Sequence, residues 1–380
     1  MNKSQFFKDF KENLEGQYEE CHGYRLLCEN QDFNPYKDLN CEEDIKKVPF
    51  IATTLFKKSN MLFSDLLRVK SDDLEKWTVS SSTTGDPSIV GRIADDMAQM
   101  RKFVELQNEV FHPNGGYDCV FYPEPEAMSK HGSQMIMGKP TESYIGNVMN
   151  IFSFSNNTTF LLKPGEDGFV FDINAFVDFI TGHDNQNDDL ALRGSTLLFY
   201  NAVEQLKDTM QPVNLGKNAI VHTGGGGWDG KKGNISADKE IDRFKFVEEV
   251  SQFLGIPQEN FIDTYSFTEN SVPITGHYSR ELKDYLFHVP EWGRVILRDI
   301  KTLEPIEHEG GRGFIQFINA YGTNAYAGAS VLVDDIGEII SLEKCPECGQ
   351  KCMTLRIIGR VKGSEAKGCG ATLNVRSEAQ

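Results

Sequence analysis

Apolar residues recur at helical spacing in several stretches of the chain. Phe6, Phe10 and Leu14 open such a pattern, and residues 1–75 as a whole are predicted to be mainly helical. The same periodicity predicts further helices over residues 94–111, 174–180 and 241–254. Nothing in the N-terminal segment suggests chemistry, so we expect it to be a layer that covers the rest of the molecule.

Short continuous apolar runs between turn residues predict β-strands. In the middle of the chain these runs lie at 77–79, 196–200, 219–223 and 261–270. They alternate with the helical segments, which favours an α/β architecture with a mixed sheet and ligand-binding loops at strand ends. After Trp292 the pattern changes to short strands separated by turns, at 294–297, 313–318, 331–333 and 338–342.

These changes of pattern divide the chain into four parts. We expect an N-terminal helical segment (1–75), an α/β core (76–290), a β-rich subdomain (291–342), and a cysteine-rich hairpin with the C-terminal tail (343–380).

Composition narrows the class of protein. The chain has 380 residues and a formal net charge of −17, which argues against an extended nucleic-acid-binding surface. No apolar run approaches the roughly 20 residues that span a bilayer, and the polar N-terminus does not resemble a signal peptide. We therefore expect a cytoplasmic protein whose eight cysteines are reduced thiols. The sequence leaves open whether the chain forms a homo-oligomer.

A hydroxyl-rich loop, SSSTTGDPS at residues 80–88, follows the predicted strand at 77–79 and precedes the helix at 94–111. Its backbone N–H and hydroxyl groups suit a phosphate, above all beside a helix N-terminus. A solvated Ser/Thr linker is the alternative on composition alone. The candidate phosphate ligands are Ser81, Ser82, Thr83, Thr84 and Gly85.

Two other turns are candidate ligand contacts. The run Gly225, Gly226, Gly227 and Trp228 follows a predicted strand, so its backbone either approaches a flat ligand closely or makes a sharp turn. His131 lies in a polar turn before a Met-rich apolar run at 135–137, which suits either one wall of an acyl pocket or core packing.

The C-terminal cysteines suggest a metal site. Cys345 and Cys348 have the CPxCG form of a zinc knuckle, and Cys352 is a third candidate ligand. Tetrahedral zinc needs a fourth donor, for which Cys369 and a histidine such as His308 are candidates; the alternative is a metal-free hairpin.

Cys369 also has a second interpretation. It stands between two glycines with Lys362 and Lys367 nearby, and neighbouring cations raise the thiolate fraction of a cysteine. An accessible thiolate near a chain end suits a covalent carrier residue. The two roles exclude each other, because a metal-bound thiolate is a poor nucleophile.

Several motifs, taken in order, resemble the adenylate-forming superfamily. The loop at 80–88 is similar to its TSGTTGxPK phosphate signature, and YSFTE at 265–269 is similar to its YGxTE motif. Asp335 lies where a ribose-binding aspartate is expected, and Gly359 with Arg360 resembles the hinge Gly-Arg, so the resemblance implies that Arg360 also contacts the nucleotide. The glycine run resembles the adenine-flanking segment of phenylacetate–CoA ligases. Within the superfamily, the HVPEW stretch at 288–292 and the cysteine-rich end resemble the LuxE-type acyl-protein synthetases.

This resemblance implies an enzyme that uses ATP and Mg²⁺ to convert a carboxylic acid, expected to be a fatty acid, into an acyl-adenylate. It implies that the acyl group then passes to Cys369 as a thioester for delivery to a LuxC-like acyl reductase. It also implies the adenylate-forming fold and a site in which Glu269 holds Mg²⁺ and Thr268 contacts the α-phosphate. Tyr265 and the glycine run would then frame adenine.

The sequence departs from the superfamily in three ways. Ser82 replaces a glycine of the phosphate loop, and Ser88 replaces its terminal lysine. The chain ends 20 residues after Arg360, so we expect no C-terminal lid domain; Lys362, Lys367 or a partner subunit would supply the missing cation. A ligase that passes the acyl group to coenzyme A or another soluble acceptor, a degenerate acyl-adenylate-binding module and a zinc-stabilised interaction protein remain alternatives.

Overall fold

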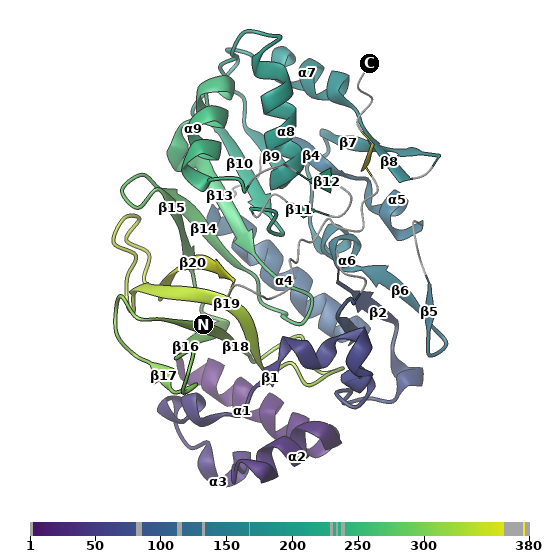
Figure 1. Cartoon of the computed structure of the whole chain (residues 1–380), viewed down its shortest axis with the longest axis vertical. Helices are drawn as coiled ribbons and strands as arrows, with labels where there is room; N and C mark the ends of the chain where they lie inside the picture. Colours follow the sequence, from purple (N-terminus) through teal and green to yellow (C-terminus); the bar gives the residue numbers. More distant parts are fainter. Residues whose placement is uncertain are drawn as a thin grey trace.

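One long mixed sheet carries most of the strands (Figure 1). The computed structural model describes residues 3–80, 86–111, 116–130, 134–166, 168–228, 231–232, 235–236, 240–360 and 375–376. Within these residues the α-helices are α1 (Lys3–Glu20), α2 (His22–Asn30), α3 (Pro35–Asp38), α4 (Ala94–Phe111), α5 (Pro125–Lys130), α6 (Tyr144–Ile151), α7 (Ile173–Gly182), α8 (Thr196–Lys207) and α9 (Arg243–Leu254).

The long sheet is parallel at one end and antiparallel at the other. Its parallel part follows the order β7 (Thr158–Gly165), β4 (Tyr117–Pro123), β9 (Leu190–Ser195), β10 (Ala219–Gly224) and β13 (Phe261–Tyr265). The antiparallel part continues through β14 (Ile274–Ser279), β15 (Asp284–His288), β20 (Thr354–Arg360), β19 (Ser330–Ser341), β18 (Arg312–Asn319), β16 (Gly293–Arg298) and β17 (Pro305–Ile306). β8 (Gly168–Phe171) and β21 (Val375–Arg376) extend the parallel end, and β1 (Ile51–Ala52) pairs with β19.

Two smaller sheets complete the strands of the described residues. One has the order β3 (Ile89–Arg92), β2 (Lys76–Val79), β6 (Lys139–Ser143) and β5 (Met135–Ile136), and the other pairs β11 (Lys231–Lys232) with β12 (Ile235–Ser236). The mixed α/β fold predicted from the sequence is therefore confirmed.

Most predicted elements lie where their apolar pattern placed them, with two corrections. The run at 196–200 is not a strand but the start of α8, and the strand is β9 immediately before it. Ser195 caps the helix by accepting the Leu198 N–H at 3.4 Å. The pattern misled because the first turn of this helix is buried all round, so the apolar run at its start lacks the polar face that identifies a helix.

The second correction concerns the segments at 331–333 and 338–342, which are one strand, β19, rather than two. The predicted turn between them is a shift in the pairing with β20, between Ile336 and Gly337. Such a bulge bends a strand without ending it.

The buried apolar side chains form two cores. The larger lies on the faces of the α/β part, under α7, α8 and α9 at the top of Figure 1. The smaller joins α1 and α2, at the bottom of Figure 1, to β18 and to the loop that follows it. Phe6, Phe10 and Leu14, whose spacing predicted a helix, are fully buried in the smaller core.

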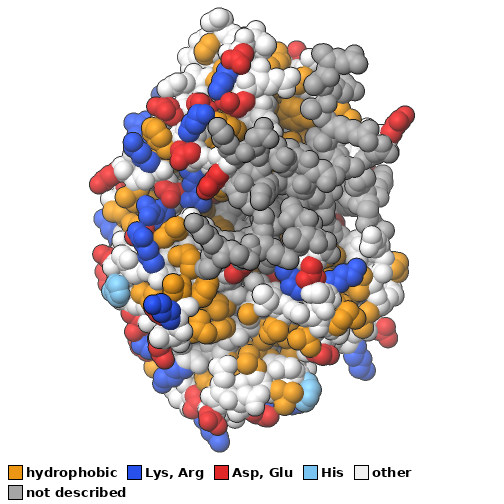
Figure 2. Space-filling view, viewed as in Figure 1, with side chains coloured by type: hydrophobic (Ala, Val, Ile, Leu, Met, Phe, Trp, Pro, Cys, Tyr) orange, Lys and Arg blue, Asp and Glu red, His pale blue; other side chains and the backbone are white. Residues whose placement is uncertain are grey.

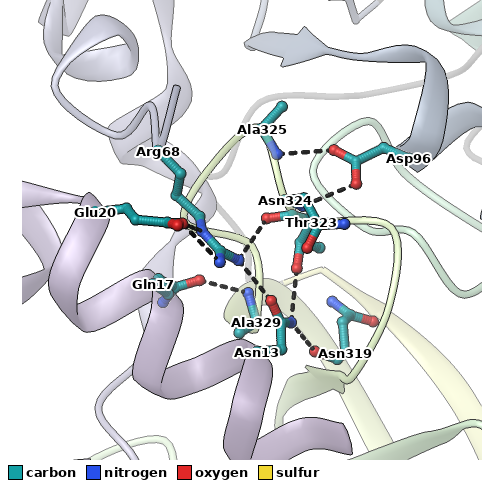
Figure 3. Close-up of polar contacts among 10 residues, drawn as sticks. All are labelled: Asn13, Gln17, Glu20, Arg68, Asp96, Asn319, Thr323, Asn324, Ala325 and Ala329. Carbon is teal, nitrogen blue, oxygen red and sulfur yellow. Dashed lines mark hydrogen bonds and ion pairs between the residues drawn. The ribbon is translucent and has the colours of Figure 1, made fainter. Parts of the chain in front are cut away.

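A polar network, here called the N-terminal clamp, holds the N-terminal segment against the end of β18 and the loop that follows it (Figure 3). Asn13 donates to the Asn319 carbonyl and to the Thr323 hydroxyl, both at 2.9 Å, and Gln17 accepts the Ala329 N–H at 2.9 Å. The clamp also includes Arg68, which bonds Asn13, Glu20 and Thr323, and Asp96, which accepts the N–H groups of Asn324 and Ala325. Asn13 and Gln17 of α1 and Asp96 of α4 thus each bond main chain of the loop at 319–329.

On the face shown in Figure 2, acidic and basic side chains of the described residues are interspersed. No helix in the described part of the chain is long and apolar enough to cross a bilayer.

Candidate active site

Hydrogen bonds hold the two ends of the hydroxyl-rich loop together and fix them to a neighbouring segment. Ser80 and Ser88 exchange two hydrogen bonds, from Ser80 N–H to the Ser88 carbonyl (2.9 Å) and from Ser88 N–H to Ser80 Oγ (2.8 Å). Asp86 accepts from the N–H and hydroxyl of Ser59 at 2.8 and 2.6 Å, and Lys57 donates to the Asp86 carbonyl at 2.7 Å. The predicted phosphate ligands Ser81, Ser82, Thr83, Thr84 and Gly85 lie outside the described residues.

The turn after β13 buries Thr268 and Glu269, each 2% exposed. Its main chain is held by Arg92, which donates to the Thr268 carbonyl at 2.6 Å, and by the Tyr326 hydroxyl, which donates to the Glu269 carbonyl at 3.0 Å. Among the described residues, the buried Glu269 Oε1 has no hydrogen-bond partner. A buried carboxylate oxygen in this state fits a cation ligand, so the predicted Mg²⁺ role of Glu269 suits the site.

Neither Arg92 nor Tyr326 was a candidate from the sequence. Arg92 ends the apolar strand β3 and is fully buried, with its guanidinium 5.0 Å from the centre of the Tyr326 ring. The sequence signal that could have identified Arg92 is a charged residue directly after an apolar strand pattern. Arginine is rarely buried unless partners satisfy its charge.

The glycine run after β10 turns sharply. Gly225, Gly226 and Gly227 have φ values of +80°, +73° and +93°, a region that L residues with side chains rarely adopt. β10 lies parallel to β13, so the glycine run and the turn at 266–269 leave the sheet at the same edge.

The structure brings together three residues predicted to contact the nucleotide. The Tyr265 hydroxyl at the end of β13 donates to Asp335 Oδ2 on β19, and Asp335 pairs with Arg360 in the β19–β20 ladder. These positions come from three separate strands, so their meeting supports the order of motifs from which they were inferred.

An apolar cavity opens beside this edge and has about 990 Å³ of empty space, including its open mouth. Its apolar wall comes mainly from α4 and α6. The side chains of this wall include Met100, Val104, Ile145, Val148, Met149 and Phe152. Gly224, Gly225 and Ser266 also line it, so the cavity reaches the glycine run and the turn after β13.

A neutral polar chain crosses one side of the cavity. His222 Nε2 lies 2.7 Å from the Thr264 hydroxyl, which lies 2.8 Å from the Thr275 hydroxyl. Burial, aided by the nearby Arg193 charge, lowers the pKa of His222 to about 3, so its imidazole is neutral at pH 7. Arg193 itself is paired with the buried Asp118 at 2.6 Å. Sequence reasoning passed over His222 because it stands inside an apolar strand.

Two of the residues or segments considered for a substrate pocket lie away from this cavity. Trp228 does not line the cavity, because its indole donates to Asp263 at 3.2 Å and packs edge-on against Phe246. The Met-rich run is not a pocket wall or core filler either, since Met135 and Met137 are 66% and 55% exposed. His131 and Cys369 lie outside the described residues.

The C-terminal cysteines meet two histidines. One donor atom each from His277, His288, Cys345 and Cys348, here called the Cys/His cluster, lies within 4.8 Å of the others. Cys352, predicted as the third ligand, is not in this group; its Sγ lies 3.9 Å from the Thr354 hydroxyl and 3.8 Å from the Gln350 carbonyl. His308 is also absent from the group, and its Nδ1 lies 3.1 Å from the Glu309 carbonyl.

A family model described as "Acyl-protein synthetase, LuxE" matches residues 1–377. The chain belongs to this LuxE family. Two similar proteins are the long-chain-fatty-acid–luciferin-component ligases of Aliivibrio fischeri and Vibrio harveyi, each 24% identical over 92% of this chain and 82% of the relative. The family makes this chain an acyl-protein synthetase, an enzyme class that forms an acyl-adenylate.

Solved structures support the fold. A 2-hydroxyisobutyryl-CoA ligase, crystallised with its acyl-AMP and coenzyme A, superposes with a TM-score of 0.64 at 14% identity, covering 96% of this chain and 69% of the ligase. An open conformation of that ligase gives a TM-score of 0.63. This LuxE chain therefore has the adenylate-forming fold predicted from its motifs.

Proposed function

We propose that this chain activates a fatty acid with ATP, holds the acyl group as a thioester on Cys369, and delivers it to an acyl reductase. In the first step a carboxylate oxygen attacks the α-phosphorus of ATP and pyrophosphate leaves. In the second step the Cys369 thiolate attacks the acyl carbon and AMP leaves. A reduced thiol is needed for this step, which is consistent with a cytoplasmic enzyme.

The observation that carries this proposal is that the apolar cavity and the predicted nucleotide site share one wall. Gly224, Gly225 and Ser266 line an otherwise largely apolar cavity, so an acyl chain held there would place its carboxylate beside the predicted adenylate site. The relatives' name supports a long-chain acid as substrate.

The nucleotide would be positioned by residues from several elements. The glycine run and Tyr265 would frame adenine, Asp335 would bind the ribose, Thr268 would contact the α-phosphate, and the loop at 81–85 would hold phosphates. Glu269 would hold Mg²⁺, which supplies charge neutralisation of the phosphates when bound. Arg92 and Tyr326 would fix the main chain that carries Thr268 and Glu269.

Acid-dependent exchange of pyrophosphate into ATP tests the first step. We expect exchange with long-chain fatty acids, and a fall of about 100-fold or more in Glu269→Gln, which keeps the side-chain volume and removes the charge. Glu259→Gln is the matched control, because Glu259 is 61% exposed in a surface ion pair with Arg280. Full exchange by Glu269→Gln would overturn the assignment of Glu269.

Labelling with radioactive acid and ATP tests the second step. Cys369→Ser is expected to keep exchange but to retain no label on the protein, whereas Cys41→Ser, which alters an exposed free thiol, should label as wild type does. Label that persists in Cys369→Ser would rule out the carrier role. Release of acyl-coenzyme A from an unlabelled wild-type protein would instead indicate a soluble acceptor.

A further inference from the structure

The four donors of the Cys/His cluster are brought together by two strand pairings. His277 on β14 faces Leu286 of β15, and His288 lies two residues beyond Leu286, so both histidines occupy one face of the hairpin. Their ring centres are 5.1 Å apart. β15 in turn pairs with β20, with His288 opposite Thr354, which brings the turn before β20 against the histidines.

That turn presents both thiols on the same side. The N–H of Cys345 donates to the Gln350 carbonyl at 2.8 Å, and the N–H of Gly349 donates to the Cys345 carbonyl at 3.1 Å. Gly349 has a φ of +76°, which the tight turn after Cys348 requires of a glycine. Cys345 and Cys348 are both free thiols.

The spacing of the donor atoms is close to that of a tetrahedral site. With bonds of about 2.0–2.3 Å to nitrogen and sulfur, the ligand atoms of tetrahedral zinc lie about 3.3–3.8 Å apart. Cys348 Sγ lies 3.6 Å from His288 Nε2, and all four donor atoms lie within 4.8 Å of one another. Small side-chain rotations would close the remaining gap.

We propose that His277, His288, Cys345 and Cys348 bind one structural Zn²⁺ per chain. Two thiolates and two imidazoles with no protein oxygen in the set favour zinc over Mg²⁺ or Ca²⁺, and four protein donors leave no open position for substrate. The ion would fasten the β14–β15 hairpin to the turn between β19 and β20.

With this ligand set, Cys369 need not serve as a zinc ligand and is free for the carrier role. Four donors complete a tetrahedral site, so neither Cys352 nor Cys369 is needed as a ligand. The proposal does not depend on the acyl-transfer function, and its tests measure metal alone.

Metal analysis of untagged protein, purified without added metal or chelator, tests the site. We expect about one zinc per wild-type chain and near-total loss in Cys345→Ser and His277→Gln. Cys352→Ser is the matched control and should keep the zinc. His277→Cys, which offers a different zinc donor at the same position, should also keep it, and this separates loss of a ligand from loss of the fold.

Cobalt provides a second measurement on the wild-type chain. Metal-free protein titrated with Co²⁺ should develop thiolate-to-cobalt and tetrahedral d–d absorption that saturates at one equivalent and disappears on adding Zn²⁺. The proposal is overturned if the wild type contains no zinc and gives no such spectrum. It is equally overturned if Cys352→Ser loses the metal while His277→Gln keeps it.

Discussion

The N-terminal clamp and the Cys/His cluster perform similar tasks with different chemistry. Each fastens a loop of the antiparallel part of the sheet to a segment far away in the chain. In the clamp, Asn13, Gln17 and Asp96 are nearly or fully buried and bond directly to main chain of the loop at 319–329 (Figure 3). In the cluster, the donor atoms face one another with a 3.6 Å contact between Cys348 and His288. The clamp is complete within the polypeptide, whereas the cluster would be completed by the proposed Zn²⁺.

This difference predicts how each region fails. A network of hydrogen bonds loses stability one bond at a time, while a four-ligand metal site is lost as a unit.

Removing the metal should open the cluster. At free zinc concentrations 100- to 1,000-fold above Kd, binding stabilises the site by about 2.7–4.1 kcal/mol. A chelator should therefore raise amide hydrogen exchange in β15 and β20 by about 100- to 1,000-fold, with little change in α1. The Cys345→Ser variant is the control, and adding the chelator to it should not change its amide hydrogen exchange. Equal effects of the chelator on α1 and β20 would contradict the distinction between the two regions.

Arg68→Ala should weaken the clamp by about 2–3 kcal/mol. The Arg68 side chain is 5% exposed and bonds Asn13, Glu20 and the Thr323 carbonyl, so its loss leaves buried acceptors without a donor. Urea unfolding would measure the change. Arg280→Ala removes an arginine that is 63% exposed and should shift the midpoint little; a comparable shift in both variants would mean that the clamp contributes no special stability.

Asp96 should give the clamp a pH dependence. Burial raises the pKa of Asp96 above 3.8, although the N–H groups of Asn324 and Ala325 oppose this shift. The native state therefore keeps a proton that the unfolded state has lost, and this contribution to stability declines as pH rises from 3.8 through the raised pKa. The unfolding free energy of Asp96→Asn, relative to wild type, should increase over that pH range. A difference that is independent of pH would show that the Asp96 pKa is not raised.

Lys46→Ala should have the smallest effect. Lys46 also links the N-terminal segment to the antiparallel part, through Glu307 at 2.9 Å, but the two side chains are 38% and 64% exposed. Exposed ion pairs contribute about 0–1 kcal/mol. Thermal unfolding in low and high salt should separate Lys46→Ala from wild type by a degree or so at most; a loss as large as that of Arg68→Ala would contradict the role given to burial.

The same contrast explains what the sequence could predict. Local patterns placed the helix at 94–111, the strand at 219–223 and the Cys345–Cys348 knuckle, because each depends on neighbours along the chain. His277 and His288 reach the knuckle only through the pairing of β14, β15 and β20, which no local spacing encodes. Cys352, which the sequence suggested as the third ligand, is close to the knuckle in the chain, but its thiol lies beside the Thr354 hydroxyl.

The residues of the candidate active site likewise fall into those that sequence motifs identified and those that only distant contacts bring together. The site's motifs came from resemblance, and two of the residues named by them, Tyr265 and Asp335, are joined by a hydrogen bond. Arg92, Tyr326 and His222 were missed because they stand in apolar strands or loops and act through contacts between distant segments. Trp228 packs against Asp263 and Phe246 rather than lining the cavity, and the sequence could not show this because an aromatic residue after a glycine run can face either a ligand or the core.

The path of β20 has a consequence for the proposed acyl carrier. This strand starts beside the Cys/His cluster and ends at Arg360, opposite Asp335. Cys369 follows nine residues later, so its Cα lies no more than about 32 Å from that fixed point, however the intervening chain is arranged. Within such a radius a tethered nucleophile reaches an effective concentration on the order of millimolar. The acyl-adenylate would thus meet this thiol more often than a free acceptor present at micromolar concentration, which would favour self-acylation over transfer to such an acceptor.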